Sequence, residues 1–518
     1  MTTSGRSGPS AHTLLRVLLW AVLATPGPLF AHGLGARHEL PAPLWLFIGG
    51  AALTVTLSFV VVAAYARRGA ERYAAAHWDL SGTLLGRLAG QAWPLAFLKF
   101  AGIAALALAL LAGFFGTSEP NRNIAPTLVW IVWWVGFSYL AMLVGNLWPS
   151  VNPWRTLYDL AAAPGLARRA AARAPHPYPA SLGCWPAMAG LLVFGWIELV
   201  FPLRATPHVL AWLLLGYSAI TWTGMARYGA DVWLRQVDPF HRLFELLSRF
   251  APFTTGAGRG LLLRPHGAGL LARESAGVAT AEVAFILAML AIVLFDGFQG
   301  SKHWLAIEDA VHALNPRLGD GGWLVLHSAG LLAMWLAFLG LYYGACALAR
   351  RAAGGATATT LELARWFAPT LIPIAIGYHF AHSFVNLVVQ AQSLAFLVSD
   401  PFGLGWNLFG TRDATVNAAI IGTGSAWYLA FGAIIAGHAF SVYLAHAVAE
   451  RMLATRAGAL RALLPMTALM ILYTIISLQI LAEPLVRYSG PQEIIIQAPA
   501  DIGLSLIVLP LPLLDNGS

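Results

Sequence analysis

One apolar run of the chain concentrates side chains that can do chemistry. His379 and His382 lie three residues apart, and Asn386 and Gln390 follow on the next turns. At helical spacing these four side chains share a stripe about 100° wide with neighbouring serines. Two histidines at positions i and i+3 can bind one divalent metal ion, or can form a hydrogen-bonded packing pair. The sequence leaves both interpretations open.

Ionisable residues in other apolar runs are the candidate partners of this stripe, because such groups are costly in a membrane. Glu198 and Asp296 are predicted as catalytic carboxylates, which complete a metal shell or take a proton from water. His327 is predicted as a further metal ligand. The groups predicted to line a polar cavity are Asn386, Gln390, Asp400 and His438. Asp296 and Asp400 also suit helix ends or turns, an alternative that stays open.

The elements that position these residues are predicted to be membrane spans. Of 518 residues, 58% are hydrophobic and 10% are charged, with a mean hydropathy of +0.68. Soluble proteins carry about 25% charged residues. The composition therefore excludes a soluble enzyme, and it excludes a nucleic-acid partner despite the net charge of +8. The two cysteines exclude a disulfide framework.

We predict an all-α polytopic bundle of about ten spans. A span needs about 20 apolar residues, and such runs lie at 43–65, 92–116, 124–148, 181–203, 208–226, 278–298, 322–348, 363–398, 417–447 and 462–483. Arg and Lys concentrate in the alternate loops 66–91, 149–180, 227–277, 349–362 and 448–461. The positive-inside rule places these loops in the cytoplasm. The sequence thus predicts a bacterial inner-membrane protein with both mature termini outside.

The chain divides into three predicted regions. Residues 1–31 read as a cleavable signal peptide, residues 32–483 as the helix bundle, and residues 484–518 as a Pro-rich extracytoplasmic tail. Cleavage would expose His32, whose α-amine and imidazole can chelate a metal such as copper. An ordinary solvated terminus is the alternative.

Three further expectations concern structure. Pro369 and Pro373 predict a kink in a segment too long for one straight span. The 227–277 segment is expected to be a solvated, topology-setting loop. Glu282, near the inner end of its span, is expected to reach water by snorkelling.

Several motifs carry a resemblance to a known family. They are His32–Leu46, Val151–Arg155, Phe295–Gly297, His379–Gln392 and Ser399–Thr411. Together they resemble the bacterial membrane proteins called fenitrothion hydrolases, over about residues 30 to 483. The resemblance implies hydrolysis of organophosphorus triesters at the P–O–aryl bond.

The expected function is therefore a membrane hydrolase, with a His-lined cavity open to the outer face. A divalent metal ion, Zn²⁺ or Cu²⁺, is an expected cofactor, because metal-bound water is a strong nucleophile at neutral pH. The expected partners are a small hydrophobic substrate and the lipid bilayer. A transporter or a transition-metal-handling protein is the alternative, and a scaffold with buried polar groups is a third. Nothing in the sequence indicates an oligomeric state.

Overall fold

The computed structural model describes residues 43–65, 69–162, 176–255, 260–271, 277–354, 358–453 and 455–482. The predicted signal peptide, the Pro-rich tail and His32 lie outside these residues.

The predicted all-α membrane architecture is confirmed. Within the described residues, nine helical segments are long and apolar enough to cross a membrane. They consist of α2 (Leu44–Tyr65), α5 (Ala92–Phe115), α6 with η2 and α7 (Ile124–Pro126, Thr127–Gly136, Phe137–Leu143), α11 (Pro207–Tyr228), α14 (Thr280–Gln299), α16 (Asp320–Ala352), α17 with η5, α18 and α19 (Thr360–Phe367, Ala368–Leu371, Ile372–Ala391, Leu394–Leu397), α20 (Thr423–Met452) and α21 (Arg456–Ala482).

The predicted span at 181–203 is shorter than expected. The apolar helix there, α10, covers Trp185–Leu199. At about 1.5 Å per residue it rises about 22 Å, less than the hydrocarbon core of about 30 Å. The remaining elements are short: α3 (Gly69–Ala75), α4 (Leu84–Ala89), η1 (Pro120–Arg122), α8 (Trp148–Val151), α9 (Pro153–Ala161), α12 (Ala230–Gln236), α13 (Pro239–Ser248), η3 (Ala268–Leu270), α15 (Lys302–Leu314), β1 (Trp78–Asp79), β2 (Phe253–Thr255) and β3 (Leu261–Leu263).

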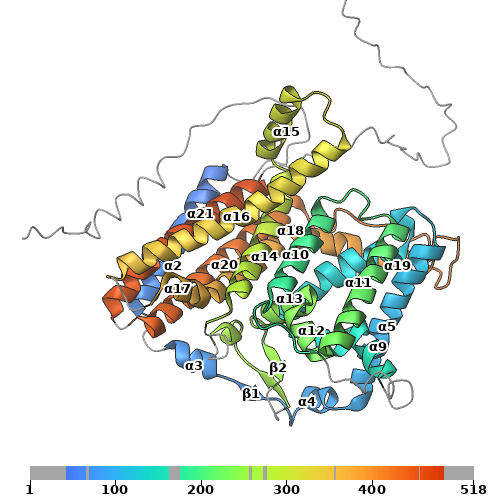
Figure 1. Ribbon diagram of the computed structural model, residues 1–518, viewed down its shortest axis with the longest axis horizontal. Helices are drawn as coiled ribbons and strands as arrows, with labels where there is room; N and C mark the ends of the chain where they lie inside the picture. The colour runs from blue at the N-terminus through green and yellow to red at the C-terminus, as the bar shows by residue number, and fades with distance from the viewer. Residues whose placement is uncertain are drawn as a thin grey trace, which may run out of the picture.

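Helix α14 lies at the centre of the bundle. It packs against α10, α16 and α18, and most of its side chains are buried. Helices α2, α16, α20 and α21 form a group on one side of it, and α5, α9 and α11 lie on the other (Figure 1). An apolar helix buried on all sides suits a central position, and the charged residues at its two ends then face the interior of the protein.

Helices α18 and α20 cross at two glycines. A Cβ at Gly437 would lie 2.4 Å from the carbonyl oxygen of Pro373, and a Cβ at Gly377 would lie 2.5 Å from that of Ala433. Only glycine allows two helix backbones to approach so closely. The predicted interruption near Pro369 is also present, because the 3₁₀ turn η5 separates α17 from α18. This turn sets the direction of the helix that carries both histidines.

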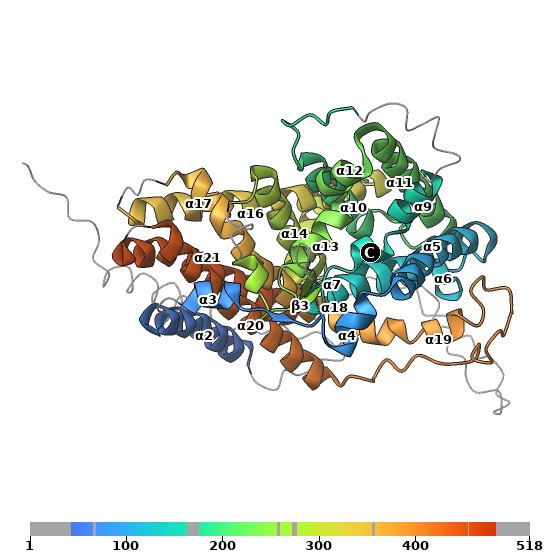
Figure 2. The same ribbon diagram turned by 90° about the horizontal axis from the view of Figure 1, so that it is seen from below.

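Loops predicted to share one side of the membrane contact one another. Strand β3 pairs antiparallel with β1 and β2, and thereby joins segment 66–91 to segment 227–277. Arg451 donates to the carbonyl of Leu271, which lies in the same group of loops. We call this side the basic face. On the opposite face, the amides of Thr117 and Ile124 donate to the carbonyls of Phe402 and Pro401. Figure 2 shows the segment after α19 running beside α5 and α6.

Segment 227–277 is not simply a solvated loop. Its helix α13 packs against α7 and α10, and Phe244 and Leu246 are completely buried. Asp238 caps α13 by accepting hydrogen bonds from the amides of Phe240 and His241. The sequence predicts a solvated loop because α13 is only ten residues long and its apolar face lies among arginines, so the segment does not resemble a membrane span.

Glu282 does not reach water either. Its side chain is 5% exposed and bonds at 2.8 Å to Arg242 of α13 and at 3.1 Å to Arg249, the C-cap residue of the same helix. Glu245 bonds to the same two arginines. We call Arg242, Glu245, Arg249 and Glu282 the ionic network. A buried carboxylate is tolerated here because two guanidinium groups neutralise it, so snorkelling is unnecessary.

Candidate functional site

Four predicted residues gather near the opposite face. They are Glu198 on α10, Asp296 on α14, and His379 and His382 on α18, and we call them the acid–histidine cluster. Nε2 of His382 lies 2.7 Å from Oδ2 of Asp296. The Asp296 side chain is 42% exposed and that of His382 is 19% exposed. This pair is therefore hydrogen-bonded, and other side chains cover it only in part.

Glu198 joins the cluster through a tryptophan. Nε1 of Trp134, on η2, donates to Oε1 of Glu198 at 2.5 Å. The same indole packs edge-on against the His379 ring, with centroids 6.4 Å apart. Asp296 lies within electrostatic range of Glu198, and Arg204 lies within range of both carboxylates. Trp134 thus connects Glu198 on α10 with His379 on α18.

The His379 ring is less well satisfied than its neighbours. Its Nε2 is buried and has no hydrogen-bond partner among the described residues. The Tyr139 ring packs 5.5 Å from it, and the Tyr139 hydroxyl donates to the carbonyls of His379 and Phe380. An unpaired buried nitrogen carries a desolvation cost of about 1–3 kcal/mol. A water molecule or a ligand beside His379 would remove that cost.

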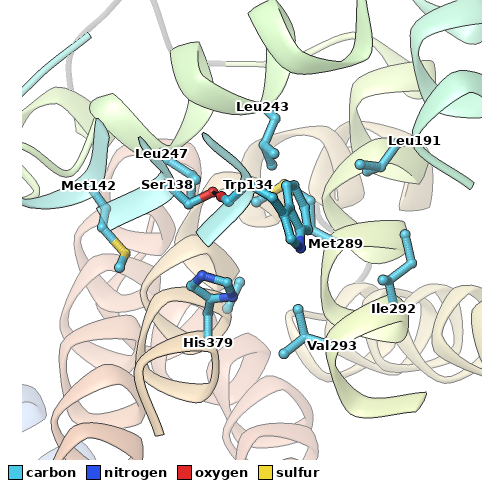
Figure 3. A pocket seen from close by; sticks show the side chains of 11 residues that line it. Trp134, Ser138, Met142, Leu191, Leu243, Leu247, Met289, Ile292, Val293 and His379 are labelled. Atoms are coloured by element: carbon cyan, nitrogen blue, oxygen red, sulfur yellow. Dashed lines mark hydrogen bonds between the residues drawn. The ribbon is translucent and has the colours of Figure 1, made fainter. Parts of the chain in front are cut away.

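A small cavity borders this nitrogen. Figure 3 shows the His379 ring facing it together with the Trp134 indole, and side chains of α13 and α14 close it from other sides. The lining is mostly apolar and the volume is about 40 Å³. This space accommodates a few water molecules. A nitrophenyl phosphotriester is several times larger and would have to bind on the exposed side of Asp296 and His382.

Gly297, the last residue of the Phe295–Gly297 motif, has a packing role. A Cβ there would lie 2.6 Å from the Tyr378 hydroxyl. Tyr378 in turn stacks on His382, with an interplanar angle of 11°. Glycine at 297 therefore lets Tyr378 support the ring that bonds to Asp296.

The other predicted site residues lie apart from the cluster. His327 pairs with Glu308 at 3.2 Å, and the Trp304 indole packs against it. Nδ1 of His438 bonds to the carbonyl of Ile434, and its buried Nε2 has no partner in the described part of the chain. Asn386 and Gln390 are exposed on α18 beyond His382.

Asp400 belongs to a turn on the opposite face. Its two carboxylate oxygens accept hydrogen bonds from the amides of Leu404 and Gly405. The adjacent Ser399 accepts from the amide of Phe409. The Ser399–Thr411 motif is thus a hydrogen-bonded loop, and Asp400 lines a separate cavity there with Arg122 and Arg412.

The predicted metal centre does not assemble within the part of the chain that the structure describes. No group of three or more His, Cys, Asp or Glu side chains there is arranged to hold a metal ion. His382 and Asp296 together supply two ligand atoms, and His379 turns toward Trp134 and Tyr139 instead. A carboxylate paired with an imidazole nevertheless suits proton transfer, because the carboxylate orients the ring and stabilises its cation.

Sequence reasoning missed three residues of this region: Trp134, Tyr139 and Arg204. The two aromatic residues lie in a continuous apolar run, where nothing marks one side chain as different from its neighbours. A weak signal existed for Arg204, which is an arginine on the side of the membrane where arginines are few. No family model, curated protein or solved structure matches the chain.

Proposed function

We propose that this protein is a bacterial inner-membrane hydrolase that cleaves the P–O–aryl bond of neutral organophosphorus triesters. The observation that carries the proposal is the accessible hydrogen bond between His382 and Asp296. The resemblance to fenitrothion hydrolases supplies the substrate class. A neutral, apolar triester dissolves in the bilayer and can approach the site from the membrane.

The reaction needs one base. Asp296 accepts the hydrogen bond from Nε2 of His382, which leaves Nδ1 to take a proton from water. The water oxygen forms a bond to phosphorus as the bond to the aryl oxygen breaks. One proton of the water passes to His382 and then to solvent, and the other stays on the dialkyl phosphate, which loses it to solvent because it is a strong acid; the aryl oxide is the second product. A nitrophenolate leaves as an anion and needs no acid.

Glu198 has a supporting role in this proposal. It lies within electrostatic range of Asp296 and accepts a hydrogen bond from Trp134. Through this hydrogen bond Glu198 holds the Trp134 indole, which packs against the His379 ring. Zn²⁺ or Cu²⁺ at the site would use His382 and Asp296 as ligands and would need a third ligand from elsewhere.

The test is nitrophenol release from a nitrophenyl phosphotriester by the purified protein, with metal content measured on the same sample. His382→Ala and Asp296→Asn should each lower kcat/KM by about 100- to 10,000-fold. His327→Ala is the matched control, because it removes a histidine from a second His–carboxylate pair. Full activity in a folded His382→Ala protein would refute the proposal. If the parent protein contains stoichiometric metal and the His382→Ala protein does not, the proposed hydrolysis is metal-assisted.

One observation favours a second candidate, a proton- or ion-coupled transporter that handles small ions or transition metals. Helix α14 carries Glu282 near the basic face and Asp296 near the opposite face. The water-sized cavity at His379 lies between them, and Leu243 and Leu247 of α13 line it. Uptake of a labelled ion into vesicles, abolished by a proton uncoupler and absent in His379→Ala, would support transport over hydrolysis.

The orientation is part of the same proposal. With the basic face in the cytoplasm, the acid–histidine cluster opens outward and both mature termini are extracytoplasmic. A membrane-impermeant thiol reagent tests this on whole cells. A cysteine introduced at exposed Asp413 should react, and one introduced at exposed Arg350 should not.

A further inference from the structure

A further cavity lies at the basic face and is built on helices other than those that carry the acid–histidine cluster. It has a volume of about 410 Å³ and lies among α5, α9, α12 and α13. Its lining includes three cationic side chains, Lys99, Arg155 and Arg235, and two carboxylates, Asp159 and Asp231. Asn152, from the Val151–Arg155 motif, lines it as well. The proposed hydrolysis uses none of these residues.

Asn152 presents an unused donor to this cavity. Its Oδ1 accepts the amide of Arg155 and so caps α9, which identifies the other terminal atom as the NH₂ group. That Nδ2 is buried without a partner among the described residues, and the residue is only 1% exposed. Asn152 lines the cavity, and a buried amide donor without an acceptor beside a cavity favours the binding of an acceptor there.

The charges around the cavity favour an anion. Arg155 is neutralised, because Asp159 and Asp231 both bond to its guanidinium group. Lys99 forms no ion pair in the described part of the chain, and Arg235 bonds only to the backbone carbonyl of Asp231. The lining thus carries one net positive charge, and Lys99 and Arg235 are the two cations whose side chains form no ion pair with a carboxylate in the described part of the chain.

His241 adds a polar group without adding charge. Burial lowers the pKa of His241, although Asp238 opposes the shift, so the ring is neutral at pH 7. Its Nδ1 is buried and has no partner among the residues that the structure describes. A neutral ring can donate one hydrogen bond to an anion.

The depth of the cavity suits a membrane phosphate. Lys99 lies seven residues into α5, or about 10 Å from its basic-face end. Trp93, Phe97 and Phe100 on the same helix are exposed, as expected for aromatic side chains at the edge of the bilayer. From that depth the long side chain of Lys99 can extend toward the lipid headgroups, on the side where anionic lipids attract basic residues.

We propose that this cavity is a binding site for a phosphate group, held by Lys99, Arg235 and Nδ2 of Asn152. The phosphate belongs either to an anionic phospholipid or to a soluble phosphate ester, since both present the same oxygens to these donors. The inference does not depend on the proposed hydrolysis.

The experiment uses the full-length protein in nanodiscs of phosphatidylcholine with or without phosphatidylglycerol, and measures bound phosphatidylglycerol by native mass spectrometry. The double variant K99Q/R235Q should lower phosphatidylglycerol affinity by about 10- to 30-fold, since each basic residue near an anionic surface contributes about 1 kcal/mol. R350Q is the matched control, because Arg350 is exposed on the same face and lies outside the cavity. K99R keeps the charge and should keep the affinity.

Competition with glycerol phosphate identifies the source of the phosphate. Displacement of phosphatidylglycerol only at millimolar concentrations assigns the site to lipid, and displacement at micromolar concentrations assigns it to a soluble ester. Thermal unfolding in phosphatidylcholine alone checks that the double variant folds. Equal phosphatidylglycerol binding by the folded double variant and the parent protein, or equal loss in R350Q, would overturn the proposal.

Discussion

The two ends of α14 carry charged clusters with opposite properties. At the basic face, Glu282 and Glu245 share Arg242 and Arg249 at distances of 2.8 to 3.3 Å, so each charge has a partner of opposite sign. At the opposite face, Asp296 is partly exposed and Nε2 of His379 has no partner in the described chain. The first cluster fixes α13 to the bundle. The second leaves atoms available to a substrate.

The comparison suggests a criterion that distinguishes buried charges that stabilise the fold from those that take part in chemistry: whether every group in the cluster has a partner. A network in which each charged group has a partner of opposite sign stabilises one arrangement, and only Nε of Arg242 is left there without a hydrogen-bond partner among the described residues. An incompletely paired cluster costs stability, which is typical of sites that bind or react. The following predictions test that division.

The largest expected effect is on stability and belongs to the ionic network. Glu282→Ala leaves two buried guanidinium groups with only Glu245 as partner, which should cost about 3–5 kcal/mol. Unfolding in detergent, followed by circular dichroism, measures this loss. Glu119→Ala is the control, because Glu119 forms an exposed pair with Arg122 and should change stability by less than about 1 kcal/mol. Equal losses of stability in the two variants would contradict the structural role assigned to the ionic network.

The next effect is on the reaction. Asp296→Asn keeps the size of the side chain but weakens the partner that orients His382. It should raise the barrier by about 3 kcal/mol, or about 100-fold in rate, while the unfolding free energy changes by less than about 1 kcal/mol. Parallel turnover and unfolding measurements check this. A large loss of stability would place Asp296 with Glu282 as a structural residue.

A smaller effect should follow from Trp134→Phe. The ring still packs against His379, but the hydrogen bond to Glu198 disappears, and an unsatisfied carboxylate costs about 1–3 kcal/mol. Because Trp134 touches both residues, kcat should fall more than KM rises. Trp130→Phe is the matched control, because it removes an indole on the same η2 segment whose donor reaches only the carbonyl of Arg204.

The smallest predicted effect is that the stability of the fold and the turnover are lost at different pH values. Burial raises the pKa of Glu245, but Arg242 and Arg249 lower it by more, so its net pKa lies below the ordinary value. A depressed pKa stabilises the fold above about pH 4.3, and this contribution of about 1 kcal/mol or less is lost as the pH falls further. Turnover needs an unprotonated histidine, so on acidification it should be lost at a higher pH than the fold. Coincident loss of activity and fold would contradict this.

The sequence predicted the features that depend on local pattern. Hydropathy located the long spans, and Pro369 and Pro373 located the break before α18. Helical spacing placed His379 and His382 on one polar face. Each of these follows from residues within one helix.

The features that it missed depend on contacts between distant segments. Glu282 meets arginines that lie 33 and 40 residues earlier in the chain, and Trp134 meets Glu198 from 64 residues away. A single sequence contains no signal for such pairs. The same limit explains why His327 and Asp400 were grouped with Asp296 although their partners, Glu308 and the turn at Leu404, lie elsewhere.

The burial of α13 has a consequence for the biogenesis of the protein. This helix lies between α11 and α14 in the chain but packs against α7 and α10, and Glu282 of α14 anchors it. Until α14 has left the ribosome, α13 therefore lacks the residue that anchors it to the bundle. During synthesis the segment should be open to proteases and chaperones until the next span enters the membrane. A nascent chain that has released α13 but not α14 from the ribosome should be cleaved within α13, whereas one stalled far enough beyond Gln299 for α14 to have emerged should be protected.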